Sequence, residues 1–246
     1  MIVPRLSAER GHADHGWLKA LHSFSFADYY DPKEMGWGVL RVINEDRIVP
    51  GAGFGRHGHR DMEIVTYILD GALEHKDSLG NGGVIKRGEV QRMSAGKGIL
   101  HSEFNPSLVE GTHLLQIWIE PARLGTPASY EQQPLPEAEL RGRWRLVASP
   151  DGAEGSTTIG QDATLWASLL APGEALGYEL APRRLAYVHV IRGRLAVNGQ
   201  NLATGDAAKI ADEARLDFQA DEETEFLLFD LPPRFAITKP TPRRTP

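Results

Sequence analysis

Two pairs of side chains in this sequence have the types and the spacing of metal ligands. His57 and His59 are separated by one glycine, and His101 and Glu103 by one serine. Side chains alternate between the two faces of a β-strand, so residues two positions apart point the same way, roughly 7 Å apart along the strand. If the two segments are strands that lie opposite each other, three imidazole nitrogens and one carboxylate converge.

Imidazole and carboxylate ligands in this proportion suit a divalent first-row metal such as Fe(II), Mn, Ni, Cu(II) or Zn. Such a ligand set leaves coordination positions open for water or substrate, which is typical of a catalytic metal site. The chain contains no cysteine. This excludes disulfides, iron–sulfur clusters, thiolate zinc sites and a cysteine nucleophile.

The alternation that begins at His57 continues through Asp61 and Glu63, so strand periodicity predicts these carboxylates on the face of the two histidines. Glu63 is therefore a second candidate for the carboxylate at the metal. For the remaining histidines we expect structural roles. His22 is predicted to pack in the core, with a position in the wall of a pocket as the alternative. Four others are predicted to be surface or hydrogen-bonded loop residues: His12, His15, His75 and His113.

Short strand-forming runs must position these side chains, because convincing helical periodicity is scarce. The chain has 26 glycines and 16 prolines, which recur between short apolar runs such as 63–69, 114–119 and 186–191. This rhythm predicts a β-sandwich or barrel. Two segments, 67–74 and 189–197, each read as a strand, a glycine turn and a second strand, which indicates two copies of one barrel.

Domain boundaries follow from composition. We expect an N-terminal metal-binding barrel over residues 1–121, a proline-rich linker over 122–142, a second barrel over 143–233 and a flexible tail over 234–246.

Charge and hydropathy limit the partners. The formal net charge is −6, and an acidic chain argues against direct nucleic-acid binding. The sequence has no apolar run long enough to span a membrane and no apolar N-terminal signal segment. These features predict a cytoplasmic protein without a membrane partner. We expect a monomer, because two barrels already bury their own faces.

Several long segments resemble a known family. GFGRHGHRDMEIVTYILDG and the later GKGILHSEFN resemble the two motifs of the cupin superfamily. More narrowly, RGHADHGWLKALHSFSFADYYDP, MSAGKGILHSEFNPS and HLLQIWIEP are similar to segments of pirins. The resemblance implies an all-β bicupin, in which two antiparallel jelly-roll barrels are stacked, with few short helices.

The family's metal ligands fall on His57, His59, His101 and Glu103. The resemblance thus makes Glu103 the carboxylate ligand and a possible base, and it leaves Glu63 behind the ligands, orienting a histidine or accepting a proton. In the second half, Glu179 and Ala181 occupy the positions that match His57 and His59. That barrel is therefore predicted to hold no metal.

Some bacterial pirins resemble flavonol dioxygenases, which implies a function. We expect a dioxygenase that cleaves a quercetin-type flavonol with O2 and releases CO. It would use one divalent metal, with Fe(II) as the first choice and Cu, Ni, Mn, Co or Zn as alternatives. Its partners would be a small aromatic substrate and O2, held against four apolar candidates: Phe54, Met93, Phe104 and Trp118.

Two other functions fit the same residues. One is a metal-binding regulatory module that acts through protein partners. The other is a different cupin enzyme, such as an isomerase, because one fold hosts many chemistries.

Overall fold

The computed structural model describes residues 1–233, and the predicted tail over 234–246 lies outside the described residues. Nearly every element is a strand, as expected for an all-β protein. The described residues form only three short helical turns, which are η1 (Ser7–Glu9), η2 (Glu137–Glu139) and η3 (Ala153–Gly155).

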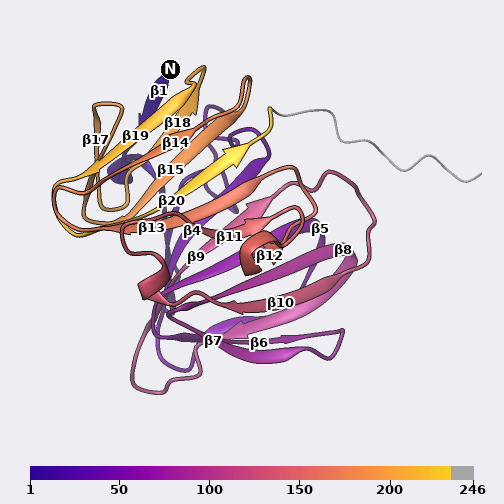
Figure 1. Ribbon diagram of the computed structural model, residues 1–246. Coiled ribbons are helices and arrows are strands. Elements are labelled where there is room, and N and C mark those ends of the chain that lie inside the picture. Colours follow the sequence, from indigo (N-terminus) through magenta and orange to yellow (C-terminus); the bar gives the residue numbers. More distant parts are fainter. Residues whose placement is uncertain (234–246) are drawn as a thin grey trace, which may run out of the picture.

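A nine-stranded sheet forms most of the first half (Figure 1). Its neighbours run in the order β2 (Gly11–Asp14), β3 (Leu18–His22), β4 (Leu40–Ile48), β9 (Thr112–Ile119), β5 (Gly53–Asp70), β8 (Glu89–Phe104), β6 (Ala72–Asp77) and β7 (Gly82–Lys86). Strand β10 (Ser129–Pro134) pairs with β8 outside this path. The long strands β5 and β8 pair with each other and carry both predicted ligand pairs.

Two sheets form the second half. The seven-stranded sheet contains, in order, β1 (Ile2–Arg5), β18 (Ala207–Ala211), β15 (Leu185–Arg192), β20 (Thr224–Leu231), β13 (Thr164–Leu170), β11 (Arg145–Ser149) and β12 (Thr157–Thr158). The four-stranded sheet contains β14 (Ala175–Glu179), β19 (Arg215–Ala220), β16 (Arg194–Val197) and β17 (Gln200–Ala203). The sheets are open and pack as sandwiches, so neither half is a fully closed barrel.

Two segments pair with sheets in which the predicted domain boundaries did not place them. Strand β1 pairs with β18, so the first residues of the chain extend a sheet of the second half, as the indigo strand in Figure 1 shows. The proline-rich segment 122–142 contains β10, which extends the first sheet beside β8. Strand β1 therefore joins the two halves in addition to the connecting chain, and that chain itself adds a strand to the first sheet.

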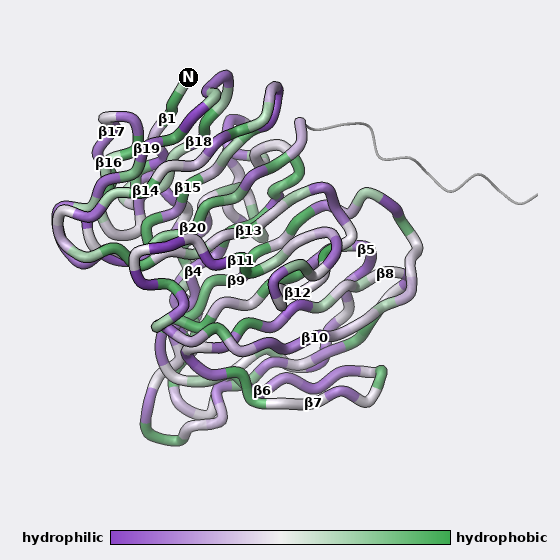
Figure 2. The backbone as a smooth tube through the Cα atoms, in the orientation of Figure 1, coloured by the Kyte–Doolittle hydropathy of each residue, from purple (hydrophilic) through white to green (hydrophobic). Residues whose placement is uncertain are grey.

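The largest core cluster contains side chains from both halves. Ile43, Val65 and Ile117 from the first sheet are buried in the same cluster as Tyr187 and Phe229 from the second half. Figure 2 shows hydrophobic stretches of β9, β13 and β20 in the middle of the molecule. The outer face of the first sheet thus packs on the second half, while its inner face remains available for a site.

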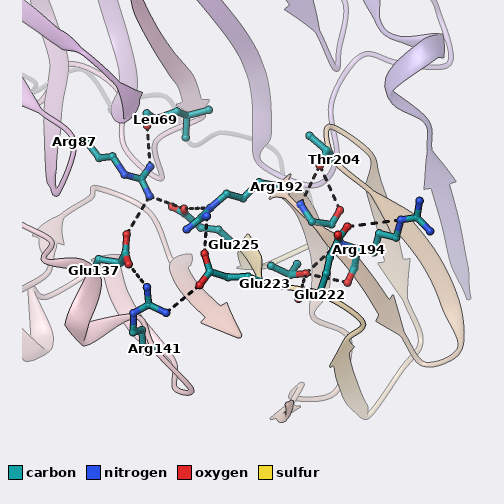
Figure 3. Close-up of polar contacts among 12 residues, drawn as sticks. Leu69, Arg87, Glu137, Arg141, Arg192, Arg194, Thr204, Glu222, Glu223 and Glu225 are labelled. Atoms are coloured by element: carbon teal, nitrogen blue, oxygen red, sulfur yellow. Dashed lines mark hydrogen bonds and ion pairs between the residues drawn. The ribbon is translucent and has the colours of Figure 1, made fainter. Parts of the chain in front are cut away.

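A group of ion pairs also joins the halves at one end (Figure 3). The Glu225 side chain, 1% exposed, accepts hydrogen bonds from Arg87 at 2.9 Å and from Arg192 at 3.2 Å. The Tyr67 hydroxyl donates a third bond to it at 2.9 Å. Three donors satisfy a carboxylate that would otherwise be costly to bury between the halves.

In the part of the chain that the structure describes, no helix is long and apolar enough to cross a membrane.

Candidate metal centre

Strands β5 and β8 bring the two predicted ligand pairs together. His57 is paired directly with His101 in the antiparallel register, as the sequence required. The two strands approach each other closely at Gly53, near the start of β5. A Cβ atom on Gly53 would lie only 2.2 Å from the Glu103 carbonyl oxygen. A glycine is therefore needed beside Glu103, since any side chain there would push β5 away from β8.

Three imidazole rings converge inside the first half. The ring centroids of His57, His59 and His101 lie 4.4–4.8 Å apart. Their candidate ligand nitrogens all lie within 4.8 Å of one another. Glu103 belongs to an overlapping group with His101 and His75 that meets the same distance limit.

Hydrogen bonds outside the centre fix which imidazole nitrogens can bind an ion. His57 Nδ1 lies 2.8 Å from the Gly55 carbonyl oxygen, an acceptor, so Nδ1 carries the proton and Nε2 has the free lone pair. His57 Nε2 faces His101 Nε2 at 3.0 Å. Two lone pairs at this distance repel each other unless a cation lies between or beside them, so the geometry fits a metal ion.

His75 holds the far side of the His101 ring. His101 Nδ1 lies 3.5 Å from His75 Nδ1, and His75 Nε2 lies 3.2 Å from Asp77 Oδ2. In the consistent assignment, His101 Nδ1–H points at His75, and His75 Nε2–H donates to Asp77. This chain leaves His101 Nε2 free for an ion, which is the usual way that outer groups orient a histidine ligand.

The prediction of a surface or loop position for His75 is therefore wrong. Its side chain is fully buried in β6, where it stacks on Tyr130 at 4.8 Å. Sequence spacing gave no signal, because β6 reaches the centre only through its pairing with β8, in which His75 lies opposite Glu103.

Burial keeps the imidazoles of His59 and His101 neutral. Desolvation, reinforced by the neighbouring histidines, lowers the pKa of His101 to about 3 and that of His59 to about 4. Neutral imidazole is the form that binds metal. The same burial disfavours protonation of His59 or His101, so a proton is a poor substitute for a metal ion between the rings.

Glu103 is the buried carboxylate that lies beside His101. It is 2% exposed, and its two oxygens accept hydrogen bonds from Gln116 at 2.9 Å and Gln91 at 3.5 Å. Burial raises its pKa to about 7 despite these two bonds. A nearby divalent cation would favour the ionised form.

Glu63 is not brought to this group. The pairing of β5 with β8 shifts between His59 and Asp61, and Asp61 has a φ of 66°. This bulge reverses the alternation, so Glu63 points away from the histidines and Ile64 faces the cavity instead. The Glu63 carboxylate accepts a hydrogen bond from Ser94 at 2.6 Å and lies beside Gly160 of the second half.

A cavity of about 720 Å³ opens from the metal centre. Five aromatic residues line it: Trp17, Phe26, Tyr29, Phe54 and Trp118. Phe54 and Trp118 were expected there. Met93 packs instead in a small core cluster with Ile64, and Phe104 is not among the lining residues.

His22 is buried, as expected, yet it also lines the cavity, where it bonds to Asn44 at 2.8 Å. In the second half, the described residues contain no group of three potential ligands within bonding range of one ion.

Comparison with known proteins identifies relatives of this chain. The family model described as Pirin matches residues 4–119, and the model described as Quercetinase C-terminal cupin domain matches residues 146–231. The chain is 47% identical over 233 residues to a quercetin 2,3-dioxygenase of Escherichia coli K12, covering 95% of this chain and 100% of the relative. It is 46% identical over 222 residues to a pirin-like protein of Caulobacter vibrioides, covering 89% and 95%.

Solved structures agree with the fold. The bacterial pirin YhhW of Escherichia coli in complex with nickel(II) superposes with a TM-score of 0.91 at 47% identity, covering 95% of this chain and 100% of that one. A quercetin 2,3-dioxygenase of Acinetobacter baumannii has a TM-score of 0.75 at 25% identity, covering 94% and 86%.

Proposed function

The chain belongs to the pirin family and has its bicupin fold, and from this premise we propose that it is a metal-dependent dioxygenase that cleaves a quercetin-type flavonol with O2 and releases CO. The observation that carries the proposal is the convergence of three imidazoles, with the buried Glu103 carboxylate grouped beside His101, in a cavity with aromatic walls. Relatives named quercetin 2,3-dioxygenase at 47% identity support the choice of substrate.

Four residues would hold the ion: His57, His59, His101 and Glu103. Fe(II) is the first choice for a dioxygenase, and the donor set also suits Ni, Mn, Co, Cu or Zn. When bound, a divalent ion with open positions acts as a Lewis acid that lowers the pKa of a coordinated hydroxyl.

The cavity supplies binding and orientation. Its volume of about 720 Å³ lies within the range of small-molecule sites. Phe26 and Trp118 meet edge to face at 5.4 Å, and Trp118 lies 4.9 Å from the His59 ring. A flat aromatic ligand that enters along this wall therefore arrives beside the histidines, shielded from water by the rings.

Glu103 is the candidate proton acceptor. It lines the cavity, and its carboxylate would take the proton from a phenolic hydroxyl whose pKa a bound divalent ion lowers. Gln116 and Gln91 hold its two oxygens, so the carboxylate stays aimed at the centre.

The test uses the full chain loaded with Fe(II) without air and then mixed with quercetin in aerated buffer. We expect the fall in flavonol absorbance to show that quercetin is consumed. One molecule of CO should be released for each molecule of quercetin consumed. His101→Ala should lose both the metal and the turnover. The matched control is His113→Gln, because His113 bonds Glu45 at 2.9 Å outside the cavity and glutamine can make the same bond. Metal-loaded protein that leaves quercetin unchanged would refute the proposal.

A further inference from the structure

Asp46 is a buried carboxyl in the cavity wall that the fold leaves without a hydrogen-bond partner. It lies on β4, two positions beyond Asn44, so both side chains face the cavity. Asp46 is 3% exposed, and within residues 1–233 nothing hydrogen bonds to its Oδ1 atom.

The polar neighbours of Asp46 are already paired. Asn44 bonds to His22, and the Gln116 amide donates to Glu103 and accepts from Thr66. The nearest strand partners of Asp46 are apolar, namely Ala20 on β3 and Leu114 on β9. The fold thus satisfies the other polar side chains of this wall from within and leaves one acceptor free.

An unpaired carboxyl in such surroundings is costly. Burial without a hydrogen bond is unfavourable for a polar group, and native proteins rarely leave one in that state. Asp46 is not one of the four candidate ligands, which lie on β5 and β8. Its position fits a group that meets a different part of the ligand from the part held at the metal centre.

We propose that Asp46 is a specificity-determining residue that accepts a hydrogen bond from a phenolic hydroxyl of the flavonol, away from the hydroxyl that faces the metal. This inference rests on the proposed function and narrows its substrate class to polyhydroxylated flavonols. A site with a lone buried acceptor rejects a ligand that lacks the matching hydroxyl, because the acceptor then loses water and gains no partner. The surrounding aromatic walls would otherwise bind both kinds of flavonol alike.

The test compares equilibrium binding of two flavonols to metal-loaded protein without air, followed by quenching of tryptophan fluorescence. Quercetin carries additional phenolic hydroxyls, whereas 3-hydroxyflavone carries only the 3-hydroxyl. We expect wild-type protein to bind quercetin roughly ten- to a hundredfold more tightly. In Asp46→Leu the ratio of the two dissociation constants should fall to within about threefold of one.

Two further variants make the comparison sharp. Asp46→Asn keeps the size and one acceptor oxygen, so it should give an intermediate ratio even if Asp46→Leu folds poorly. The control Asp70→Asn removes a carboxylate from an exposed residue at the end of β5 that does not line the cavity, and it should leave the ratio as in the wild type. Metal content and thermal midpoint are measured for every variant, so that loss of the ion or of the fold is recognised.

The outcomes separate this inference from the proposed function. A wild-type ratio near one, an unchanged ratio in both Asp46 variants, or no flavonol binding at all would overturn the role of Asp46. A large ratio that depends on Asp46, in a protein that does not turn quercetin over, would support the role of Asp46 in binding while refuting the dioxygenase.

Discussion

Which glutamate is the carboxylate ligand can be tested directly. Glu103 and Glu63 are both buried, and each lies within a few residues of a candidate histidine ligand in the sequence. The change is Glu103→Gln, compared with Glu63→Gln as the matched control. Glu103 lies with His101 and His75 in one candidate ligand group, whereas Glu63 bonds Ser94 on the other side of a bulge.

The structure sets the expected size of the effect. Groups that only orient a ligand contribute roughly 10–100-fold to metal affinity. Loss of a charged ligand should exceed this, so we expect Glu103→Gln to weaken binding by more than about 100-fold, or about 2.7 kcal/mol. The new amide also faces the donor groups of Gln116 and Gln91, and its single oxygen can accept from only one of them well. Glu63→Gln should weaken binding by less than about tenfold.

The metal-free protein should respond in the opposite direction. Burial raises the pKa of Glu103 to about 7. A carboxyl with a raised pKa binds its proton more tightly in the folded state, so its contribution to stability falls as pH rises from about 4.5 to 7. At pH 8, Glu103→Gln should therefore raise the free energy of unfolding of the metal-free protein, by at most about 3 kcal/mol.

Two assays check this pair of effects. Competition with a chromophoric chelator measures metal affinity, and urea unfolding with excess chelator measures stability. A variant that gains stability without metal yet loses metal affinity cannot have failed through misfolding. If Glu63→Gln weakens metal binding more than Glu103→Gln does, the assignment of the ligands is wrong.

Three further predictions follow from the same contacts. His75→Phe keeps a ring that can stack on Tyr130 but loses the bond toward His101. Metal affinity should therefore drop roughly 10–100-fold, while the thermal midpoint of the metal-free protein stays within a few degrees. Unchanged affinity would show that His75 does not orient His101. Glu225→Gln leaves Arg87 and Arg192 facing a neutral amide between the halves. Because both arginines are partly exposed and each keeps a second carboxylate partner, the change should cost about 1–3 kcal/mol and lower the thermal midpoint by roughly 2–12 °C in calorimetry. A midpoint equal to the wild type would contradict the role given to this cluster. Burial, followed by the charges of Glu103 and Glu45, raises the pKa of Asp46 to about 7, so metal-free wild type should lose stability relative to Asp46→Asn as pH rises from about 4 to 7, by a few kcal/mol in urea unfolding; a difference that does not change with pH would refute the raised pKa.

The sequence determined those features that depend on residues close together in the chain. Alternation along a strand was sufficient to pair His57 with His59 and His101 with Glu103, and all four side chains line the cavity. The recurrence of glycine and proline between short apolar runs likewise predicted an all-β fold. Both predictions use only the local geometry of an extended chain, which the residues themselves impose.

Only the tertiary structure decided the features that depend on how strands pair. The bulge after His59 arises from the pairing of β5 with β8, and it turns Glu63 away from the face that simple alternation assigned to it. His75 reaches His101 from β6, and Asp46 reaches the cavity from β4, although neither lies near a ligand in sequence. Strand β1 joins the second half for the same reason. Register and bulges are set by hydrogen bonds and packing between distant segments, and the pattern of a single strand does not contain that information.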